Sequence, residues 1–478
     1  MRRRSFLRAS AGAITAVALP PNTAAASAGD TLEVTIRSGP ARAGTIRARR
    51  NENFGGLLAY NGSIPGPLLR VTHGQRIVVN YSSGADVPTS IHWHGMVLPN
   101  DMDGVAGVTQ APVGFGETFR YDFAPGPPGT RWYHDHGFGF AFARGLFGAF
   151  IVDDPTDERV DREFVLVFHE VPRRGALEAA RRGTSSAPMA EPAGSPEMGR
   201  MTSAAMGDEV AYAAYCINGG AYPYGERFAA STGDRVRLRL INASPTSTRY
   251  VALAGHEMRV THADGNPLEQ PVTVDVVRIG SGERYDALVE IARPGAFLLQ
   301  SVASDPLQAA QAATIYTDGM EKAPPMRAPA TLDNLRVLSY QLAGGAIEGS
   351  TANVAAPRYE FVLAGGGFGN GRWSIDGKLW PQTPKLRVRR DELVTLRFRN
   401  TSQMDHPMHL HGHTFSLTEI DGVRLARPLA KDVVLVPAGG TATLAFTGGS
   451  PPGRWLLHCH NEVHMVDGMM MEVVYTAK

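Results

Sequence analysis

Histidines separated by a single residue are the most unusual feature of this sequence. The chain has 15 histidines among 478 residues, and at that frequency His-x-His would occur about 0.5 times by chance. It occurs five times, as His92/His94, His134/His136, His409/His411, His411/His413 and His458/His460. On a β-strand, residues i and i+2 point to the same face, and neutral imidazole is the commonest metal ligand in proteins. The pairs therefore predict metal centres built on strands.

A second set of ligand types, two imidazoles with two sulfur groups, lies in the last part of the chain. Its members are His406, Cys459, His464 and Met469. Two imidazoles, a thiolate and a weak axial thioether are the ligands of a copper electron-transfer site, and methionine is not a usual zinc ligand. Cys459 stands between His458 and His460, so on a strand its sulfur points away from both imidazoles. One strand would then join the two kinds of site through a few covalent bonds.

A three-part pattern recurs at a domain-sized interval. It begins with a turn at Asn61-Gly62, Asn218-Gly219 and Asp376-Gly377, spaced by 157 and 158 residues. An alternating strand that ends in Asn follows, at 74–80, 233–242 and 391–400. A strand that begins at a glycine closes the pattern, at 116–121, 282–287 and 440–445. Such alternation is typical of strands with one buried face, and three copies in the same order predict three homologous domains.

The composition agrees with an all-β protein. The chain has 53 Gly and 33 Pro with only 19% charged residues, which favours short strands and tight turns. We expect three consecutive Greek-key β-sandwich domains, at about residues 30–155, 160–325 and 330–478. The first and third would each contribute four histidines, so face-to-face packing would gather eight imidazoles at their interface. The second domain is predicted to be a spacer without ligands, in which His256 and His262 are ordinary polar residues.

The N-terminal segment 1–28 has the pattern of an export signal. Three arginines precede an apolar run and a small-residue cleavage site, and Arg3-Arg4 with the residues that follow looks like a twin-arginine signal. This would place the mature chain in the periplasm or outside the cell; a disordered basic tail is the alternative. No later segment is apolar enough to span a membrane. The net charge of +1 disfavours nucleic-acid binding.

The segment 173–208 combines Pro, Gly and Ser with four methionines, and it is predicted to be a mobile excursion before the core of the second domain. The methionines are Met189, Met198, Met201 and Met206. Two interpretations remain open: loosely packed filler, or exposed thioethers that bind Cu(I). Of the two cysteines, Cys216 is expected to be a small buried residue.

The motifs that contain these histidines resemble the four copper motifs of the three-domain multicopper oxidases, the laccase-like family, from about Thr31 onward. They are 92-HWHG-95, 134-HDH-136, 406-HPMHLH-411 and 458-HCH-460 with His464 and Met469. The resemblance implies cupredoxin-like domains and four copper ions per chain. It makes His406, Cys459, His464 and Met469 the type 1 ligands, and His92 and His409 the type 2 ligands. It assigns one type 3 copper to His94, His134 and His460, and the other to His136, His411 and His458.

The resemblance also implies a mechanism, in which a reducing substrate is oxidised at type 1 copper and O2 is reduced to water at the trinuclear cluster. Asp103 matches an acidic position near the type 2 copper and would handle protons; alternatively it is a turn residue in Asp101-Met102-Asp103-Gly104. Met465 departs from the family, because several bacterial relatives have an acid there. The sequence leaves the replacement open, as it does the oligomeric state.

Three functions are consistent with these residues. The first is a laccase-type oxidase of phenols or aromatic amines, with O2 as acceptor. The second is a periplasmic cuprous oxidase that serves copper tolerance, suggested by the methionine segment and by His464-Met465 and Gly468-Met469, which resemble the bacterial copper-resistance oxidases. The third is a copper-binding protein without turnover, which the complete set of ligands disfavours.

Overall fold

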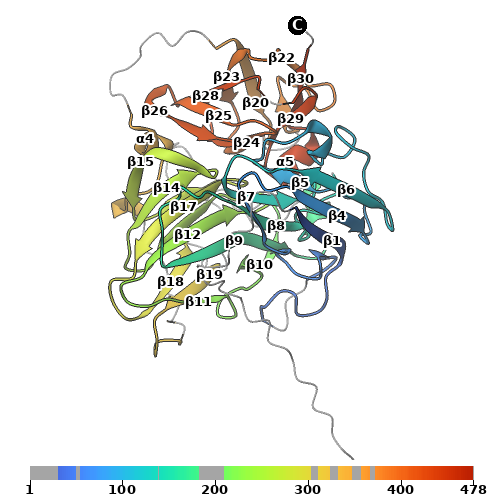
Figure 1. Ribbon diagram of the computed structural model, residues 1–478. Coiled ribbons are helices and arrows are strands. Elements are labelled where there is room, and N and C mark those ends of the chain that lie inside the picture. Colours follow the sequence, from blue (N-terminus) through green and yellow to red (C-terminus); the bar gives the residue numbers. More distant parts are fainter. Residues whose placement is uncertain are drawn as a thin grey trace, which may run out of the picture.

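The computed structural model of the chain describes residues 31–49, 54–137, 139–181, 209–302, 310–322, 324, 332–346, 357–366, 372–449 and 451–476 (Figure 1). Within these residues the strands form six sheets, which fall along the chain into three consecutive pairs. Two sheets that pack face to face bury the inward side chains of both. The structure confirms the all-β class, and the exact domain boundaries stay predictions.

The first sheet pair, in the order β2-β1-β4-β6 and β3-β8-β7-β5, comes from the N-terminal third. Its strands are β1 (Leu32–Pro40), β2 (Leu58–Tyr60), β3 (Leu69–Thr72), β4 (Ile77–Ser83), β5 (His92–His94), β6 (Thr118–Phe123), β7 (Gly129–His134) and β8 (Phe147–Asp153). A single 3₁₀ turn, η1 (Asn100–Met102), lies between β5 and β6. In these sheets β1 pairs in parallel with β4, and β3 pairs in parallel with β8.

The second sheet pair has the orders β10-β9-β12-β17-β14-β15 and β11-β19-β18-β13-β16. Its strands are β9 (Arg162–Pro172), β10 (Tyr212–Ile217), β11 (Arg227–Ala229), β12 (Arg235–Asn242), β13 (Arg249–Leu253), β14 (Met258–Ala263), β15 (Asn266–Val274), β16 (Val277–Ile279), β17 (Arg284–Glu290), β18 (Ala296–Ser301) and β19 (Ala312–Tyr316). The short helix α1 (Ala176–Arg181) follows β9.

The third sheet pair has the orders β21-β20-β23-β28-β25-β26 and β22-β30-β29-β24-β27. Its strands are β20 (Tyr359–Ala364), β21 (Ser374–Ile375), β22 (Leu386–Val388), β23 (Leu393–Asn400), β24 (His406–Leu410), β25 (Phe415–Ile420), β26 (Val423–Lys431), β27 (Val433–Val436), β28 (Thr441–Thr447), β29 (Arg454–Cys459) and β30 (Met470–Tyr475). The helical segments are η2 (Leu332–Asn334), α4 (Tyr340–Gly344) and α5 (Glu462–Asp467).

The turn that begins the sequence repeat has the same role in each sheet pair. Asn61, Asn218 and Asp376 all have φ near +50° and are followed by glycines that also have positive φ. Asparagine and aspartate tolerate this left-handed backbone better than other side chains. Each side chain also accepts a hydrogen bond from the first strand of its pair, from the N–H groups of Arg37, Val167 and Val362, respectively. The repeat is therefore a repeat of structure.

The second part of the repeat needs one correction. Asn242 and Asn400 end β12 and β23, and each accepts a hydrogen bond from the backbone N–H two residues on. In the first sheet pair this place belongs to Ser83, which ends β4 and accepts from the N–H of Ala85. Asn80 lies inside the strand and donates to Glu33. A short serine side chain makes the same local bond, so matching asparagines placed the end of this strand three residues too early.

The edges of the first and third sheet pairs meet at the interface predicted to hold the histidines. In Figure 1, β5 and β7 lie next to β24 and α5, with the second sheet pair beside both. Strand β5 pairs β7 with His92 opposite His134, and β24 pairs β29 with His409 opposite His458. The histidines of the two related domains therefore occupy equivalent positions in their own sheets.

Two of the predicted segments lie outside the described residues. These are the export signal at 1–28 and the methionines Met189, Met198, Met201 and Met206. In the part of the chain that the structure describes, no helix has the length and apolar character that crossing a membrane requires.

Candidate metal centres

Strands β24 and β29 and helix α5 bring the predicted type 1 ligands together. His406 begins β24, Cys459 ends β29 and His464 lies in α5. Cys459 Sγ is 3.4 Å from Nδ1 of His464 and 3.7 Å from Nδ1 of His406, and the two Nδ1 atoms are 3.0 Å apart. Met469 is fully buried, and its backbone is hydrogen-bonded to His464 and Cys459. The four predicted residues thus occupy one buried place in the third sheet pair.

Polar residues outside this group orient its two imidazoles. The Oγ of Ser402 lies 2.9 Å from Nε2 of His406, which leaves Nδ1 of that ring facing the sulfur. The carboxylate of Glu209 lies 3.0 Å from Nε2 of His464. Asn461 caps α5 by accepting hydrogen bonds from the N–H groups of Val463 and His464. The hydrogen bond made by the second ring nitrogen of a metal-binding histidine fixes the tautomer of the ring. The contacts of Ser402 and Glu209 with the Nε2 atoms therefore leave both Nδ1 atoms directed at one point.

The eight predicted cluster histidines converge at the interface. Nε2 atoms face one another at 3.4 Å between His92 and His409, at 3.4 Å between His134 and His460, at 3.4 Å between His136 and His458 and at 2.9 Å between His411 and His458. His94 is the exception, because it faces His134 through Nδ1, at 3.4 Å. These contacts place His92 beside His409, His134 and His460 beside one another, and His136 and His411 beside His458. The donor atoms of His92 also lie within 4.8 Å of those of His94 and His134 and of those of His409 and His411, so the assignment of each ligand to one ion stays a prediction.

Both groups have the donor chemistry of bound copper. Burial lowers the pKa of the His94, His406 and His411 imidazoles well below their usual value and that of His458 to about 4, so these rings are neutral. In a neutral ring only one nitrogen carries a hydrogen. Where that nitrogen is bonded to a partner outside the cluster, the other nitrogen directs its lone pair at the neighbouring ring. Burial also raises the pKa of the Cys459 thiol, so a thiolate there requires an adjacent cation. Soft sulfur with imidazoles suits copper.

Cys459 connects the two groups as the sequence predicted. Its sulfur faces His406 and His464, whereas the rings of His458 and His460 belong to the other group. The alternation of β29 sends successive side chains to opposite faces. The two centres are therefore joined by the backbone of adjacent residues.

The second sheet pair lacks these ligands for a visible reason. Arg249 pairs with Ile279 across β13 and β16 as His406 pairs with Val436 across β24 and β27. In the same register, Ser301 stands where β29 has Cys459. Arg249 forms a buried ion pair with Glu170 there. His256 and His262 make only local polar contacts and an ion-pair contact with Asp157, as expected of ordinary polar residues.

Two aspartates occupy matching places beside the imidazole cluster. The carbonyl of Asp103 accepts from Nδ1 of His92 at 2.8 Å, and its Oδ2 lies 2.9 Å from Nδ1 of His411. The carbonyl of Asp432 accepts from Nδ1 of His409 at 2.9 Å, and its Oδ1 lies 3.1 Å from Nε2 of His94. Asp103 follows η1 and is fully buried against ligands, so its place is not explained by turn formation alone.

Two further buried carboxyls lie between the ligands. Burial raises the pKa of Asp135 to about 7, and burial together with Asp135 raises the pKa of Glu462 well above its usual value. Asp135 accepts from the N–H groups of Ser90 and Gly137, and Glu462 accepts from the N–H of Ala143. Met465, at the predicted departure from the family pattern, packs with Val105, Leu456 and Met470.

Sequence reasoning missed the residues that orient the ligands. Ser402, Glu209, Ser281 and Asp432 all bond a predicted ligand through the ring nitrogen that does not face the metal position. Glu209 and Ser281 come from the second sheet pair, which was predicted to be only a spacer. No local spacing marks such contacts, since Glu209 and His464 are 255 residues apart in the chain.

The fold and the two groups of ligands define a copper protein built from cupredoxin-type domains. Three models described as multicopper oxidase match residues 44–157, 193–319 and 355–478. The chain belongs to the multicopper oxidase family. It is 37% identical over 434 residues to multicopper oxidase MmcO of Mycobacterium tuberculosis, a match that covers 87% of this chain and 83% of that protein.

Other similar proteins carry two different functional names. Laccase-2 of Botryotinia fuckeliana is 27% identical, over 87% of this chain and 78% of that protein. A copper resistance protein A homolog of Pseudomonas syringae is 26% identical, over 87% and 88%. Among solved structures, the multi-copper oxidase from Pseudomonas thermotolerans superposes with a TM-score of 0.69 at 25% identity and covers 94% of this chain and all of that one.

Replacing either orienting serine should weaken one centre and spare the other. In Ser402→Ala, His406 loses the bond that fixes its tautomer, and we expect about 10–100-fold weaker copper binding at the sulfur-containing group. Ser281→Ala should affect the imidazole cluster instead, because Ser281 Oγ lies 3.1 Å from Nδ1 of His460. Copper retention against a chelator, read by copper–thiolate absorbance and by total copper, checks both. Equal loss at both centres in either variant would contradict the assignment.

Proposed function

We propose that this chain is a laccase-type oxidase, which couples four one-electron oxidations of a phenol or aromatic amine to the reduction of one O2 to two waters. The observation that supports this most strongly is β29, which has Cys459 on one face and two cluster imidazoles on the other. A protein that only stored copper would not need a thiolate-containing site that is connected to an imidazole cluster through the backbone of adjacent residues.

Four copper ions, when bound, would supply the redox chemistry, since each changes by one electron and O2 needs four. The residues proposed to hold the type 1 ion are His406, Cys459, His464 and Met469. The type 2 ion is assigned to His92 and His409. The type 3 pair is assigned to His94, His134 and His460 and to His136, His411 and His458.

The donor side of the molecule is marked by Glu209. Its carboxylate contacts Nε2 of His464, and its side chain keeps 19% of its surface exposed, whereas His464 and His406 are fully buried. Burial alone would raise the pKa of Glu209, but His464 and Asn461 lower it overall, so the group is a carboxylate. A carboxylate at this place can accept a hydrogen bond from a phenol O–H or an amine N–H. The reducing substrate would therefore dock beside Glu209, whose carboxylate connects it to the buried ring of His464.

Asp103 is proposed to handle protons on the O2 side. Its Oδ2 bonds His411, whereas its Oδ1 has no hydrogen-bond partner within the described residues and lies 3.3 Å from Nδ1 of His92. A buried carboxyl group that lies between two ligands, with one oxygen free of hydrogen bonds, can accept a proton there and pass it on.

The segment 1–28 is proposed to direct export, so that this reaction would take place in the periplasm or outside the cell.

Cys459→Ser should abolish donor-driven O2 consumption, because it removes the sulfur ligand and the link to the cluster. Oxygen uptake by the copper-loaded protein with a dimethoxyphenol is the measurement. The matched control is Cys216→Ser, since Cys216 is equally buried but lies in β10, and it should keep most of the activity. Equal uptake by Cys459→Ser and wild type would refute the proposed function.

Asp103→Asn should slow O2 reduction by about 10²-fold, the usual contribution of a general acid or base. The amide is isosteric and can still accept from His411, so the ligands should stay in place. The anaerobic bleaching of the copper–thiolate band by the donor should keep its wild-type rate. If anaerobic bleaching slows as much as turnover, or turnover is unchanged, Asp103 has no role in proton transfer.

A cuprous oxidase that serves copper tolerance is the second candidate. It is supported by the copper resistance protein among the similar proteins and by the methionine-bearing stretch before β10. The two functions differ in the preferred donor, so kcat/KM should be compared for Cu(I) and a dimethoxyphenol, with and without residues 185–207. If the deletion lowers kcat/KM for Cu(I) but not for the dimethoxyphenol, the second candidate is favoured. If kcat/KM for Cu(I) is unchanged by the deletion, a role for the methionines is excluded.

A further inference from the structure

The second sheet pair, which has no predicted ligand, reaches the imidazole cluster through the turn between β16 and β17. In this turn, Gly282 has φ +82°, and a Cβ there would lie 2.9 Å from the ring of His460 and 3.2 Å from that of His94. Arg284 is the first residue of β17 and is fully buried. The turn therefore places the backbone of the second sheet pair against cluster ligands, with an arginine immediately behind them.

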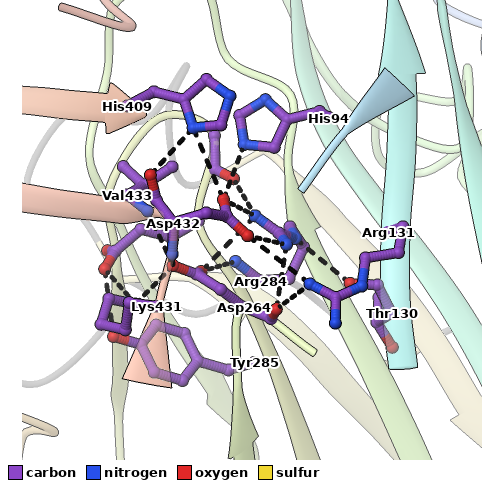
Figure 2. A network of polar contacts seen from close by, with 12 residues as sticks. His94, Thr130, Arg131, Asp264, Arg284, Tyr285, His409, Lys431, Asp432 and Val433 are labelled. Atoms are coloured by element: carbon purple, nitrogen blue, oxygen red, sulfur yellow. Dashed lines mark hydrogen bonds and ion pairs between the residues drawn. The ribbon is translucent and has the colours of Figure 1, made fainter. Parts of the chain in front are cut away.

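Arg284 holds the aspartate that bonds two of those ligands. Its Nη1 and Nη2 each donate to one oxygen of Asp432 at 2.7 Å, which is a two-pronged ion pair (Figure 2). Asp432 in turn bonds His94 through Oδ1 and His409 through its carbonyl. One ligand from the first sheet pair and one from the third are thus fixed by a single residue, whose carboxylate is held by the two short bonds from Arg284 of the second pair. Nη1 of Arg131, from β7 of the first pair, lies further away, 3.5 Å from Oδ2 of Asp432.

The guanidinium has no freedom to turn away. Besides the two bonds to Asp432, it donates to the carbonyls of Thr130, Gly282 and Asp264 at 3.2, 3.1 and 3.0 Å. An arginine has five N–H donors, and all five are used here. Thr130 belongs to the first sheet pair, so the side chain joins all three pairs, and a lysine could not reproduce the fork.

The neighbouring residues are shaped around this ion pair. Gly95 directly follows His94 and has φ +79°; a Cβ there would lie 2.3 Å from Arg284 Nη2 and 2.7 Å from Asp432 Oδ2. Asp264 accepts hydrogen bonds from the N–H groups of Asp432 and Val433, and it forms an ion pair with Nζ of Lys431 at 2.9 Å. In Figure 2 the rings of His94 and His409 lie on one side of Asp432, and Arg284 and Asp264 lie on the other.

The matching aspartate of the cluster has no such clamp. Asp103 bonds His92 and His411 as Asp432 bonds His409 and His94, yet no arginine or lysine pairs with Asp103 in the described part of the chain. The two halves of the cluster are therefore held differently. His94 is also the one cluster ligand that faces its neighbour through Nδ1, which requires its Nε2–H to point at Asp432.

We infer that Arg284 is a positioning residue for the trinuclear copper cluster. By fixing the carboxylate of Asp432 it selects the tautomer of His94 that presents Nδ1, and it holds His94 and His409 at the spacing that the cluster requires. The second sheet pair then contributes to copper binding without supplying a ligand. This inference rests on the proposed function, because it takes the eight imidazoles to be copper ligands.

The test compares substitutions of Arg284 with the same substitutions of Arg239. Arg239 is buried in the neighbouring strand β12, pairs with Glu163 and Asp286 and bonds Thr130, but it does not contact Asp432. For Arg284→Met and Arg239→Met, we would measure Tm, copper per chain, copper–thiolate absorbance and the EPR signal of the type 2 ion. Arg284→Lys and Arg239→Lys keep the charge and serve where a methionine variant does not fold.

We expect Arg284→Met to bind cluster copper about 10–100-fold more weakly and to change the type 2 EPR signal, with unchanged copper–thiolate absorbance. Arg284→Lys should recover part of the cluster copper. The Arg239 variants should keep all the copper even if Tm falls as much. Wild-type copper content and EPR in Arg284→Met, or the same loss in both series, would overturn the inference. A wild-type protein that binds only one copper would refute the proposed function instead.

Discussion

The structure depends on one physical constraint: imidazole lone pairs must point at one another in a buried space. Eight rings from two sheet pairs meet at distances of about 3 Å between nitrogens. Such an arrangement is stable only if every ring is neutral, if its second nitrogen has a fixed partner, and if a cation lies between the lone pairs. Burial favours the first condition by lowering the pKa of rings such as those of His94 and His411, and metal-binding proteins meet the second with hydrogen bonds from neighbouring groups.

The partners of the second nitrogens come from all three sheet pairs. Backbone carbonyls of Asp103 and Asp432 serve His92 and His409, while their carboxylates serve the ligands of the opposite pair. The symmetry follows from the duplicated β-sandwich, because equivalent strands carry equivalent histidines. The symmetry is broken where the second sheet pair contacts His460 through Ser281 and Asp432 through Arg284. A domain that supplies no predicted ligand thus has a structural function at the site.

Much of this could be predicted from the sequence. The period of the Asn-Gly turn predicted three related units, and the spacing of the histidine pairs predicted which strands face the interface. Strand alternation around Cys459 predicted the two faces of β29. The histidine pairs and the position of Cys459 depend on local geometry, because residues two apart on a strand point to the same face and adjacent residues point to opposite faces. Matching residue types failed only where a different residue makes the same bond, as Ser83 does in place of an asparagine.

The residues around the ligands could not be predicted for a different reason. Glu209, Ser281 and Arg284 act on groups that are more than a hundred residues away in the chain. Their roles arise from the packing of one sheet pair on another, which no periodicity records. Glu462, whose burial raises its pKa, is similar: the sequence showed an acid beside the ligands but not that its surroundings exclude water.

The distribution of the ligands along the chain has a consequence for how the protein is assembled. His406, Cys459, His464 and Met469 all belong to the third sheet pair, so that group can form once this part has folded. The imidazole cluster draws on residues 92–136 and 409–460, with Ser281 and Arg284 from the part between. It therefore exists only after synthesis has passed residue 460 and the two ends have docked. Copper bound there would act as a crosslink between the first and last thirds of the chain, and a truncated or incompletely docked chain could not hold it.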